Sequence, residues 1–103
     1  MIKRIYIAGP MTGLPDHNFP AFDAMATKLR GSWEWDEVIS PREINAHYAP
    51  DYNPVHRHDW LRNDLRELLR CTHIMLLRGW PQSKGAMLEL SVAHALNMVV
   101  MHE

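Results

Sequence analysis

Apolar positions along the chain follow two kinds of pattern. Four runs are short, continuous and closed by turn or polar residues, which is typical of buried strands. These runs cover residues 5–8, 38–40, 73–77 and 98–101. Between them, apolar residues recur three and four positions apart, which is typical of amphipathic helices. The helical stretches begin near residue 19 and cover about 55–70 and 85–97.

Each predicted helix has one apolar face that should pack on the sheet. The predicted buried faces are Phe22, Met25, Ala26 and Leu29, then Trp60, Leu61, Leu65, Leu68 and Leu69, and finally Leu88, Val92, Ala95 and Leu96. Residues 9–18 contain two glycines and two prolines, so we expect a loop of turns there. Residues 44–54 are rich in Pro, Asn, Asp and Tyr and are expected to be irregular.

The strands and helices alternate, which predicts a parallel sheet with helices on both faces. We expect a single α/β domain over residues 1–103, flavodoxin-like or Rossmann-like, with strand order 2-1-3-4. In such a sheet, ligands bind beyond the carboxyl ends of the strands. The segments that leave the strands at that edge are residues 9–13, 40–41 and 78–85.

Composition excludes several kinds of partner. Eleven basic and twelve acidic residues give a net charge of −1, which provides no footprint for polymeric nucleic acid or an anionic membrane. Cys71 is the single cysteine, so no internal disulfide can form and a reducing compartment is expected. The first residues lead directly into a strand rather than a signal peptide, and no apolar run approaches the roughly 20 residues of a membrane span. We therefore expect a cytoplasmic protein.

The segment from Ser83 to Glu89 opens the third predicted helix at the ligand edge. Free N–H groups there, the Ser83 hydroxyl and the Lys84 ammonium could hold a phosphate near Gly85, although Ser83 could equally be an ordinary helix cap. Glu89 lies about one turn inside the helix and should lean back toward the same crevice. The alternative is that Glu89 faces solvent.

Asp64 lies in the middle of the second predicted helix, where an aspartate commonly pairs with a nearby arginine such as Arg57, Arg62 or Arg66. The functional alternative is that Asp64 meets Glu89 across the crevice. Two carboxyl groups in different environments can serve as one nucleophile and one general acid, as in glycosidic bond chemistry.

The glycine-containing loop from Gly9 to Gly13 matches neither a Walker loop nor a Rossmann fingerprint, so it could be a plain loop. His56 and His58 point about 200° apart on a helix and do not favour a shared metal. With one cysteine in the chain, we expect no metal site. Trp80, in the loop after the third strand, could stack on a base.

Together these segments resemble the nucleoside 2-deoxyribosyltransferase superfamily, which includes deoxynucleoside 5′-phosphate N-hydrolases. They look most like its small uncharacterised members carried by phages and prophages. The resemblance covers nearly the whole chain and rests on residues 6–11, on Asn63-Asp64-Leu65 and on residues 83–89, which follow the family pattern Ser-x-Gly-x-x-x-Glu-Leu.

The resemblance implies a role for each matching position. Glu89 would be the nucleophile that forms a glycosyl-enzyme intermediate, and Asp64 would be the acid or base that handles the leaving base. The remaining positions implied or suggested to bind substrate are Tyr6, Gly9, Pro10 and Met11 around the sugar, and Ser83, Lys84 and Gly85 around the 5′ end. No metal or organic cofactor is implied. The family's subunits pair so that one walls the other's pocket, so we expect a homodimer or a dimer of dimers.

The leading hypothesis is cleavage of the N-glycosidic bond of a deoxynucleoside or its 5′-monophosphate. Hydrolysis is favoured over transfer because Ser83 occupies a position where transferases of the family carry an acidic residue. The alternative is a module that binds a nucleotide or a nucleotide-derived signal without turnover, and a further alternative is a purely structural interaction protein.

Overall fold

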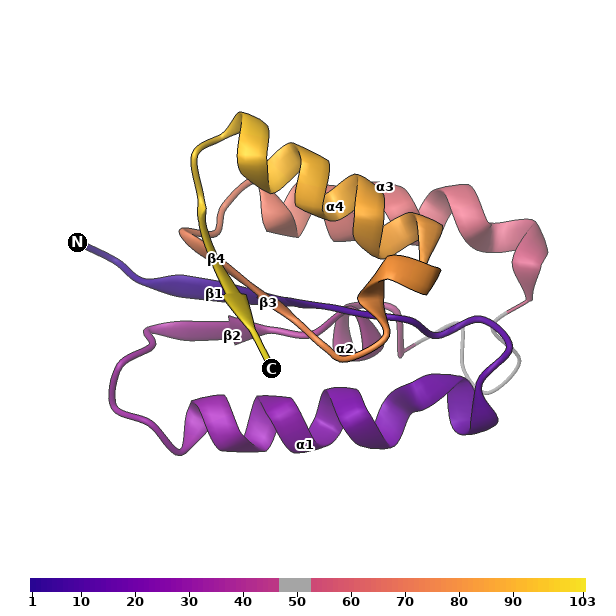
Figure 1. The fold of residues 1–103 in the computed structure, drawn as a ribbon, viewed down its shortest axis with the longest axis horizontal. Coiled ribbons are helices and arrows are strands. Elements are labelled where there is room, and N and C mark those ends of the chain that lie inside the picture. Colours follow the sequence, from indigo (N-terminus) through magenta and orange to yellow (C-terminus); the bar gives the residue numbers. More distant parts are fainter. Residues whose placement is uncertain (47–52) are drawn as a thin grey trace.

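A computed structural model describes residues 1–46 and 53–103 and contains one parallel sheet. Its four strands lie in the order β2-β1-β3-β4, which confirms the predicted α/β fold and strand order (Figure 1). The strands are β1 (Arg4–Ala8), β2 (Glu37–Ile39), β3 (His73–Leu76) and β4 (Val99–His102). In the centre of the sheet, Tyr6 lies opposite Ile39 on one side and Ile74 on the other.

Helices cover both faces of the sheet, as predicted. Helix α1 packs on one face, whereas α3 and α4 lie together on the other (Figure 1). The helices are α1 (Phe19–Arg30), α2 (Pro41–Ile44), α3 (Arg57–Leu68) and α4 (Lys84–Ala95). Single 3₁₀ turns occur at η1 (Pro15–Asn18), η3 (Pro54–His56) and η4 (Trp80–Gln82). In the described residues no helix is long and apolar enough to cross a membrane.

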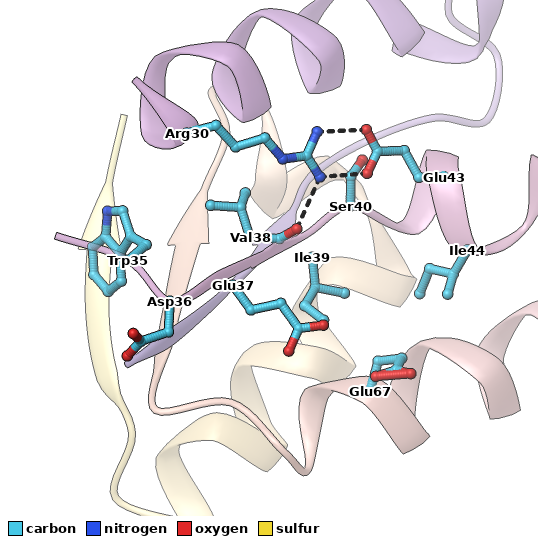
Figure 2. Close-up of a pocket in the computed structure, with 10 residues that line it drawn as sticks. All are labelled: Arg30, Trp35, Asp36, Glu37, Val38, Ile39, Ser40, Glu43, Ile44 and Glu67. Carbon is cyan, nitrogen blue, oxygen red and sulfur yellow. Dashed lines mark hydrogen bonds and ion pairs between the residues drawn. The ribbon is translucent and has the colours of Figure 1, made fainter. Parts of the chain in front are cut away.

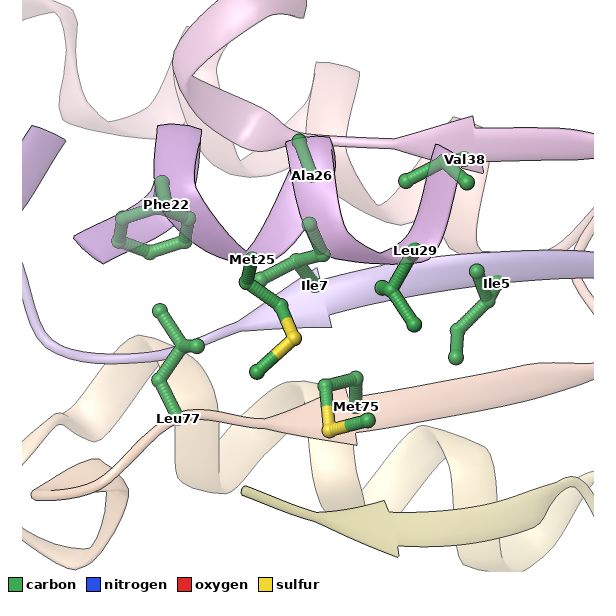
Figure 3. Packing of buried hydrophobic residues seen from close by; sticks show 9 residues of the cluster. All are labelled: Ile5, Ile7, Phe22, Met25, Ala26, Leu29, Val38, Met75 and Leu77. Atoms are coloured by element: carbon green, nitrogen blue, oxygen red, sulfur yellow. The ribbon is translucent and has the colours of Figure 1, made fainter. Parts of the chain in front are cut away.

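Helix α1 buries the face that its sequence predicts. Its four apolar residues at helical spacing pack against Ile5 and Ile7 of β1 and against Met75 of β3 (Figure 3). Because side chains alternate along a strand, Tyr6 and Ala8 of β1 project to the opposite face, under α3 and α4. This alternation places the one tyrosine of β1 beneath the two helices that carry the candidate carboxyl groups.

The predicted buried face of α4 is wrong at Leu88, Ala95 and Leu96, whereas Val92 is partly buried and packs against the core as predicted. Helix α4 buries Ala86, Glu89 and Ala93, whereas Leu88 and Leu96 are 41% and 49% exposed. Small alanine side chains allow the helix backbone to approach the sheet closely, and this packing outweighs the burial of the larger leucines. In the second helix, Leu69 is also exposed rather than buried, because α3 ends at Leu68.

The sequence interpretation also missed the short helix α2, since Pro41 was expected only to end a strand. Pro41 occupies the first helical position, where its missing N–H costs nothing, and Ser40 precedes it in extended conformation. In the predicted irregular segment, Ile44 therefore belongs to α2 and Pro54 to a 3₁₀ turn. The rest of that expectation for residues 47–52 lies outside the described residues.

A candidate active site of buried carboxyl groups

Tyr6 and Glu89 form a contact between the centre of the sheet and the inner face of α4. Tyr6 is fully buried, and its hydroxyl donates a hydrogen bond to a carboxylate oxygen of Glu89. Glu89 is 5% exposed, so the interpretation of a solvent-facing glutamate is wrong. The two alanines at its sides allow α4 to lie low on the sheet, which brings the carboxyl group within reach of the tyrosine.

Asp64 lies on α3 and is held by an asparagine that the sequence interpretation did not single out. The side-chain amide of Asn45 donates to Asp64 Oδ1 at 2.7 Å and to the carbonyl of Pro41 at 3.1 Å. Asn45 is itself buried, and its Oδ1 accepts a hydrogen bond of 3.1 Å from Asn63. In the described residues, therefore, Asp64 is held by an amide and not by the arginine that helical spacing had suggested.

The environment raises the pKa of both carboxyl groups. Burial raises the pKa of Glu89 to about 8, the nearby Asp64 carboxylate adds to this effect, and the Tyr6 hydrogen bond opposes it. Burial also raises the pKa of Asp64 to about 7, against the lowering effect of Asn45. The pKa of Tyr6 is raised well above its ordinary value, first by burial and then by Glu89 and Asp64. Near neutral pH this cluster therefore retains protons that ordinary carboxyl groups would have lost.

Ser83 caps α4 at the edge of the sheet where β3 ends. Its Oγ accepts a hydrogen bond of 3.1 Å from the N–H of Ala86, so the capping role expected of this serine is present. The first N–H groups of a helix, here at Lys84 and Gly85, have no partner inside the helix. The end of α4 thus retains the donors that an anion requires.

At two glycines, the loop after β1 packs closely against the loop after β3. A Cβ at Gly9 would lie 2.8 Å from Cβ of Leu77, and one at Gly79 would lie 3.3 Å from Cγ of Pro10. Gly79 also has a φ of +85°, which disfavours other residues. Met11 packs against the core on the α1 side of the sheet. Tyr6, Asp64 and Glu89 therefore lie close together on the side of the sheet that α3 and α4 cover, whereas Met11 packs on the side that α1 covers.

Among the cavities lined by described residues are two that Glu89 and Asp64 do not line. One, of about 500 Å³, follows the edge strand β2. There Arg30 donates to Glu43 at 2.7 Å and to the carbonyl of Val38 at 2.9 Å (Figure 2). The other, of about 370 Å³, lies between the loops after β1 and β3.

The fold and the cluster of Tyr6, Asp64 and Glu89 define the class of protein. It is an α/β protein with a parallel sheet. A buried tyrosine of that sheet donates a hydrogen bond to one of two carboxyl groups, and the pKa values of both carboxyl groups are raised. In the described residues, no group of three or more histidine, cysteine, aspartate or glutamate side chains could hold a metal ion. The chain belongs to the family described as a domain of unknown function (DUF4406), whose model matches residues 3–102. No curated protein matches the chain.

Proposed function

We propose that this protein hydrolyses the N-glycosidic bond of a deoxynucleoside 5′-monophosphate, with Glu89 as nucleophile. The observation that carries the proposal is the buried bond from Tyr6 to Glu89, with the Asp64 carboxyl group close enough to raise the pKa of Glu89. The same three positions support the resemblance to the nucleoside 2-deoxyribosyltransferase superfamily. Tyr6 would orient the nucleophile, since its hydroxyl fixes one carboxylate oxygen.

The two carboxyl groups divide the reaction between them. Ionised Glu89 attacks the anomeric carbon while the bond to the base nitrogen breaks, and its electron pair leaves with the base. Asp64 gives its proton to the leaving base. A water molecule then attacks the anomeric carbon, loses a proton to Asp64 and releases Glu89. A pKa of about 7 suits Asp64 to this exchange, because the group can both hold and give up a proton near neutral pH.

The pKa order of the two groups leads to a distinctive pH dependence. The productive form has Glu89 ionised and Asp64 protonated, although the pKa of Glu89, about 8, exceeds that of Asp64, about 7. Both groups are protonated at low pH and both are ionised at high pH, and neither form reacts. The profile of kcat/KM against pH should therefore be a narrow bell with its maximum between these two pKa values. The apparent pKa of each side of the bell describes the interacting pair of carboxyl groups and not one residue alone. A rate that is flat between about pH 6 and 9 would contradict this assignment.

Release of free base from a panel of deoxynucleoside 5′-monophosphates, followed by liquid chromatography, tests the proposal directly. Glu89→Gln should abolish base release and leave ligand affinity within a few-fold of the wild type. Asp64→Asn should slow turnover by roughly 10²- to 10⁴-fold, the usual contribution of one acid–base group. Glu34→Gln is the matched control, because Glu34 is exposed and pairs with Lys3 at the surface. Equal activity in the wild type and Glu89→Gln would end the catalytic proposal.

The amino-terminal end of α4 supports the choice of a phosphorylated substrate. The Lys84 and Gly85 N–H groups and the helix dipole favour an anion there, and Ser83 adds no negative charge. A 5′-monophosphate should therefore bind about 1–3 kcal/mol more tightly than its nucleoside. Ser83→Asp should remove that preference and still cap the helix, because aspartate is also a good cap. Calorimetry on both ligands measures the effect, and a wild-type preference for the nucleoside would refute the assignment.

A second candidate function is favoured by the burial of Glu89. A carboxyl group that is 5% exposed, with a pKa of about 8, is largely neutral at pH 7 and could serve to hold α4 on the sheet. In that case the protein would bind a nucleotide without turnover. The same chromatographic assay separates the two functions, since binding without released base supports the non-catalytic module.

A further inference from the structure

Neither Glu89 nor Asp64 lines the cavity between the loops after β1 and β3. Its walls include Pro10, Leu14 and Asn18 from one loop and Arg78, Gly79 and Gln82 from the other. Asn18 immediately precedes α1, so the cavity lies at the amino-terminal end of α1. Glu89 and Asp64 belong to α4 and α3, which pack on the other face of the sheet. The volume of about 370 Å³ is within the range of small-molecule sites.

The walls of this cavity are fixed in place. The Asn18 side-chain amide donates to the carbonyl of Pro10 at 2.9 Å and so ties the two ends of the loop together. Gly79 packs against the ring of Pro10 from the opposite side. Because the two loops hold each other, the cavity is formed without a ligand and requires little reorganisation to bind one.

The loop after β1 also contains a turn with a strained backbone conformation. Asp16, His17 and Asn18 have φ values of 51°, 53° and 61°, so three consecutive residues other than glycine are left-handed. Each such residue costs roughly 1–2 kcal/mol. Backbone strain of this kind clusters at ligand sites, where it holds a wall in a required shape. Here it places Asn18 on the cavity.

Arg78 is an exposed residue on the wall of the cavity, and its side chain carries a positive charge. Its backbone N–H donates to a carboxylate oxygen of Glu103 at 2.8 Å, which fixes the backbone at this point. Its guanidinium group makes no hydrogen bond or ion pair with any residue in 1–46 or 53–103. A guanidinium group offers paired donors that match a carboxylate or a phosphate. The nearby walls at Pro10 and Leu14 are apolar and suit a hydrocarbon or aromatic body.

We propose that this cavity is a binding site for a small organic anion, whose oxyanion pairs with Arg78 and whose apolar body packs on Pro10 and Leu14. Pro10 is also among the positions that the resemblance implies for the sugar, but neither Glu89 nor Asp64 lines this cavity, so binding here can be tested independently of the proposed hydrolysis. Phosphate and carboxylate share the chemistry that Arg78 recognises, so both are used as probes below.

Titration of the ¹⁵N-labelled protein with phenyl phosphate and with benzoate tests the site. Both probes, or one of them, should shift the amide signals of Thr12, Leu14, Asn18 and Gln82. Arg78→Gln should weaken binding roughly tenfold or more, as expected for loss of a charge-assisted bond. Leu14→Ser should weaken binding of phenyl phosphate but leave the weaker binding of inorganic phosphate unchanged. Lys28→Gln is the charge-matched control, since Lys28 lies near the other end of α1 from Asn18.

Three results would overturn the proposal. The first is equal affinity of the wild type and Arg78→Gln for the probe that binds more tightly. The second is the absence of shifts in the loop amides at millimolar probe. The third is a set of shifts confined to Ser83, Gly85 and Glu89, which would place the anion at the carboxyl site and would leave the proposed hydrolysis intact.

Discussion

Replacing Glu89 by glutamine should stabilise the protein at alkaline pH, whether or not the protein is an enzyme. In the folded chain the pKa of Glu89 is about 8, against an ordinary value of 4.5. The folded state therefore binds a proton more strongly than the unfolded state does. The stability of the wild type should fall as pH rises between these two values, because the unfolded chain can ionise the group freely. Glutamine removes this loss, since it cannot ionise, and its side-chain oxygen can still accept the Tyr6 hydrogen bond.

The size of the effect follows from the difference between the two pKa values. The difference is roughly 3.5 pKa units, and each unit corresponds to about 1.36 kcal/mol, so the full effect approaches about 5 kcal/mol above pH 8. Between about pH 5.5 and 9, the wild type should lose about 3 kcal/mol relative to Glu89→Gln. Asp64 contributes a similar fall in both proteins, so it largely cancels in the comparison. An effect of this size is a large part of the 5–15 kcal/mol that typically stabilises a domain.

Urea denaturation of the two proteins at a series of pH values measures this difference. The curves of unfolding free energy against pH should diverge as pH rises, with Glu89→Gln above the wild type at the alkaline end. Glu34→Gln should run parallel to the wild type, because Glu34 is exposed and its ion pair lies at the surface. Parallel curves for the wild type and Glu89→Gln between about pH 5.5 and 9 would refute the reasoning, since the carboxyl group would then titrate as in the unfolded chain.

Three further changes test other parts of the structure. Asn45→Ala removes the amide that lowers the pKa of Asp64, so the pKa of Asp64 should rise above about 7. A titration followed by carboxyl-carbon NMR measures this pKa, and an unchanged value would contradict the contact between Asn45 and Asp64. Gly9→Ala places a methyl group 2.8 Å from Cβ of Leu77 and should cost about 1–3 kcal/mol in urea denaturation, whereas wild-type stability would show that the loops are not closely packed. If a homodimer forms through the exposed apolar side of α4, Met87→Glu should dissociate it, because Met87 is exposed on that side. Analytical ultracentrifugation measures the assembly, and a monomeric wild type at micromolar concentration would exclude it.

The sequence was a good guide to the fold because the central strands, β1 and β3, are buried on both faces. Such strands must be continuously apolar, and that pattern has few other interpretations. Helix α1 was equally clear, since its polar and apolar sides are distinct. Helix α4 was not, because apolar residues surround it and leucines at helical spacing looked more buried than the alanines. Its true orientation depends on how closely the helix approaches the sheet, which is a property of the folded packing.

The candidate site was only partly visible in the sequence. Glu89 and Asp64 could be singled out from their places on predicted helices near the ligand edge. Their environment could not be predicted. The partner of Glu89 is Tyr6, 83 positions away, which the resemblance implied only as a residue near the sugar and not as a hydrogen-bond partner of Glu89. Asn45 was missed for a related reason. It lies in a segment that looked irregular, and only the short helix α2 turns its amide toward α3.

The contact between Arg30 and the carbonyl of Val38 has a consequence for self-association. An edge strand normally presents free backbone groups that can recruit a strand from another molecule. On β2 the arginine occupies the outward carbonyl, and Glu43 anchors the arginine in place. Continuation of the sheet between copies is therefore disfavoured at β2, which leaves the opposite edge, at β4, as the more accessible one. A two-fold contact through a single usable edge is closed after two copies, so the fold resists growth into a fibre.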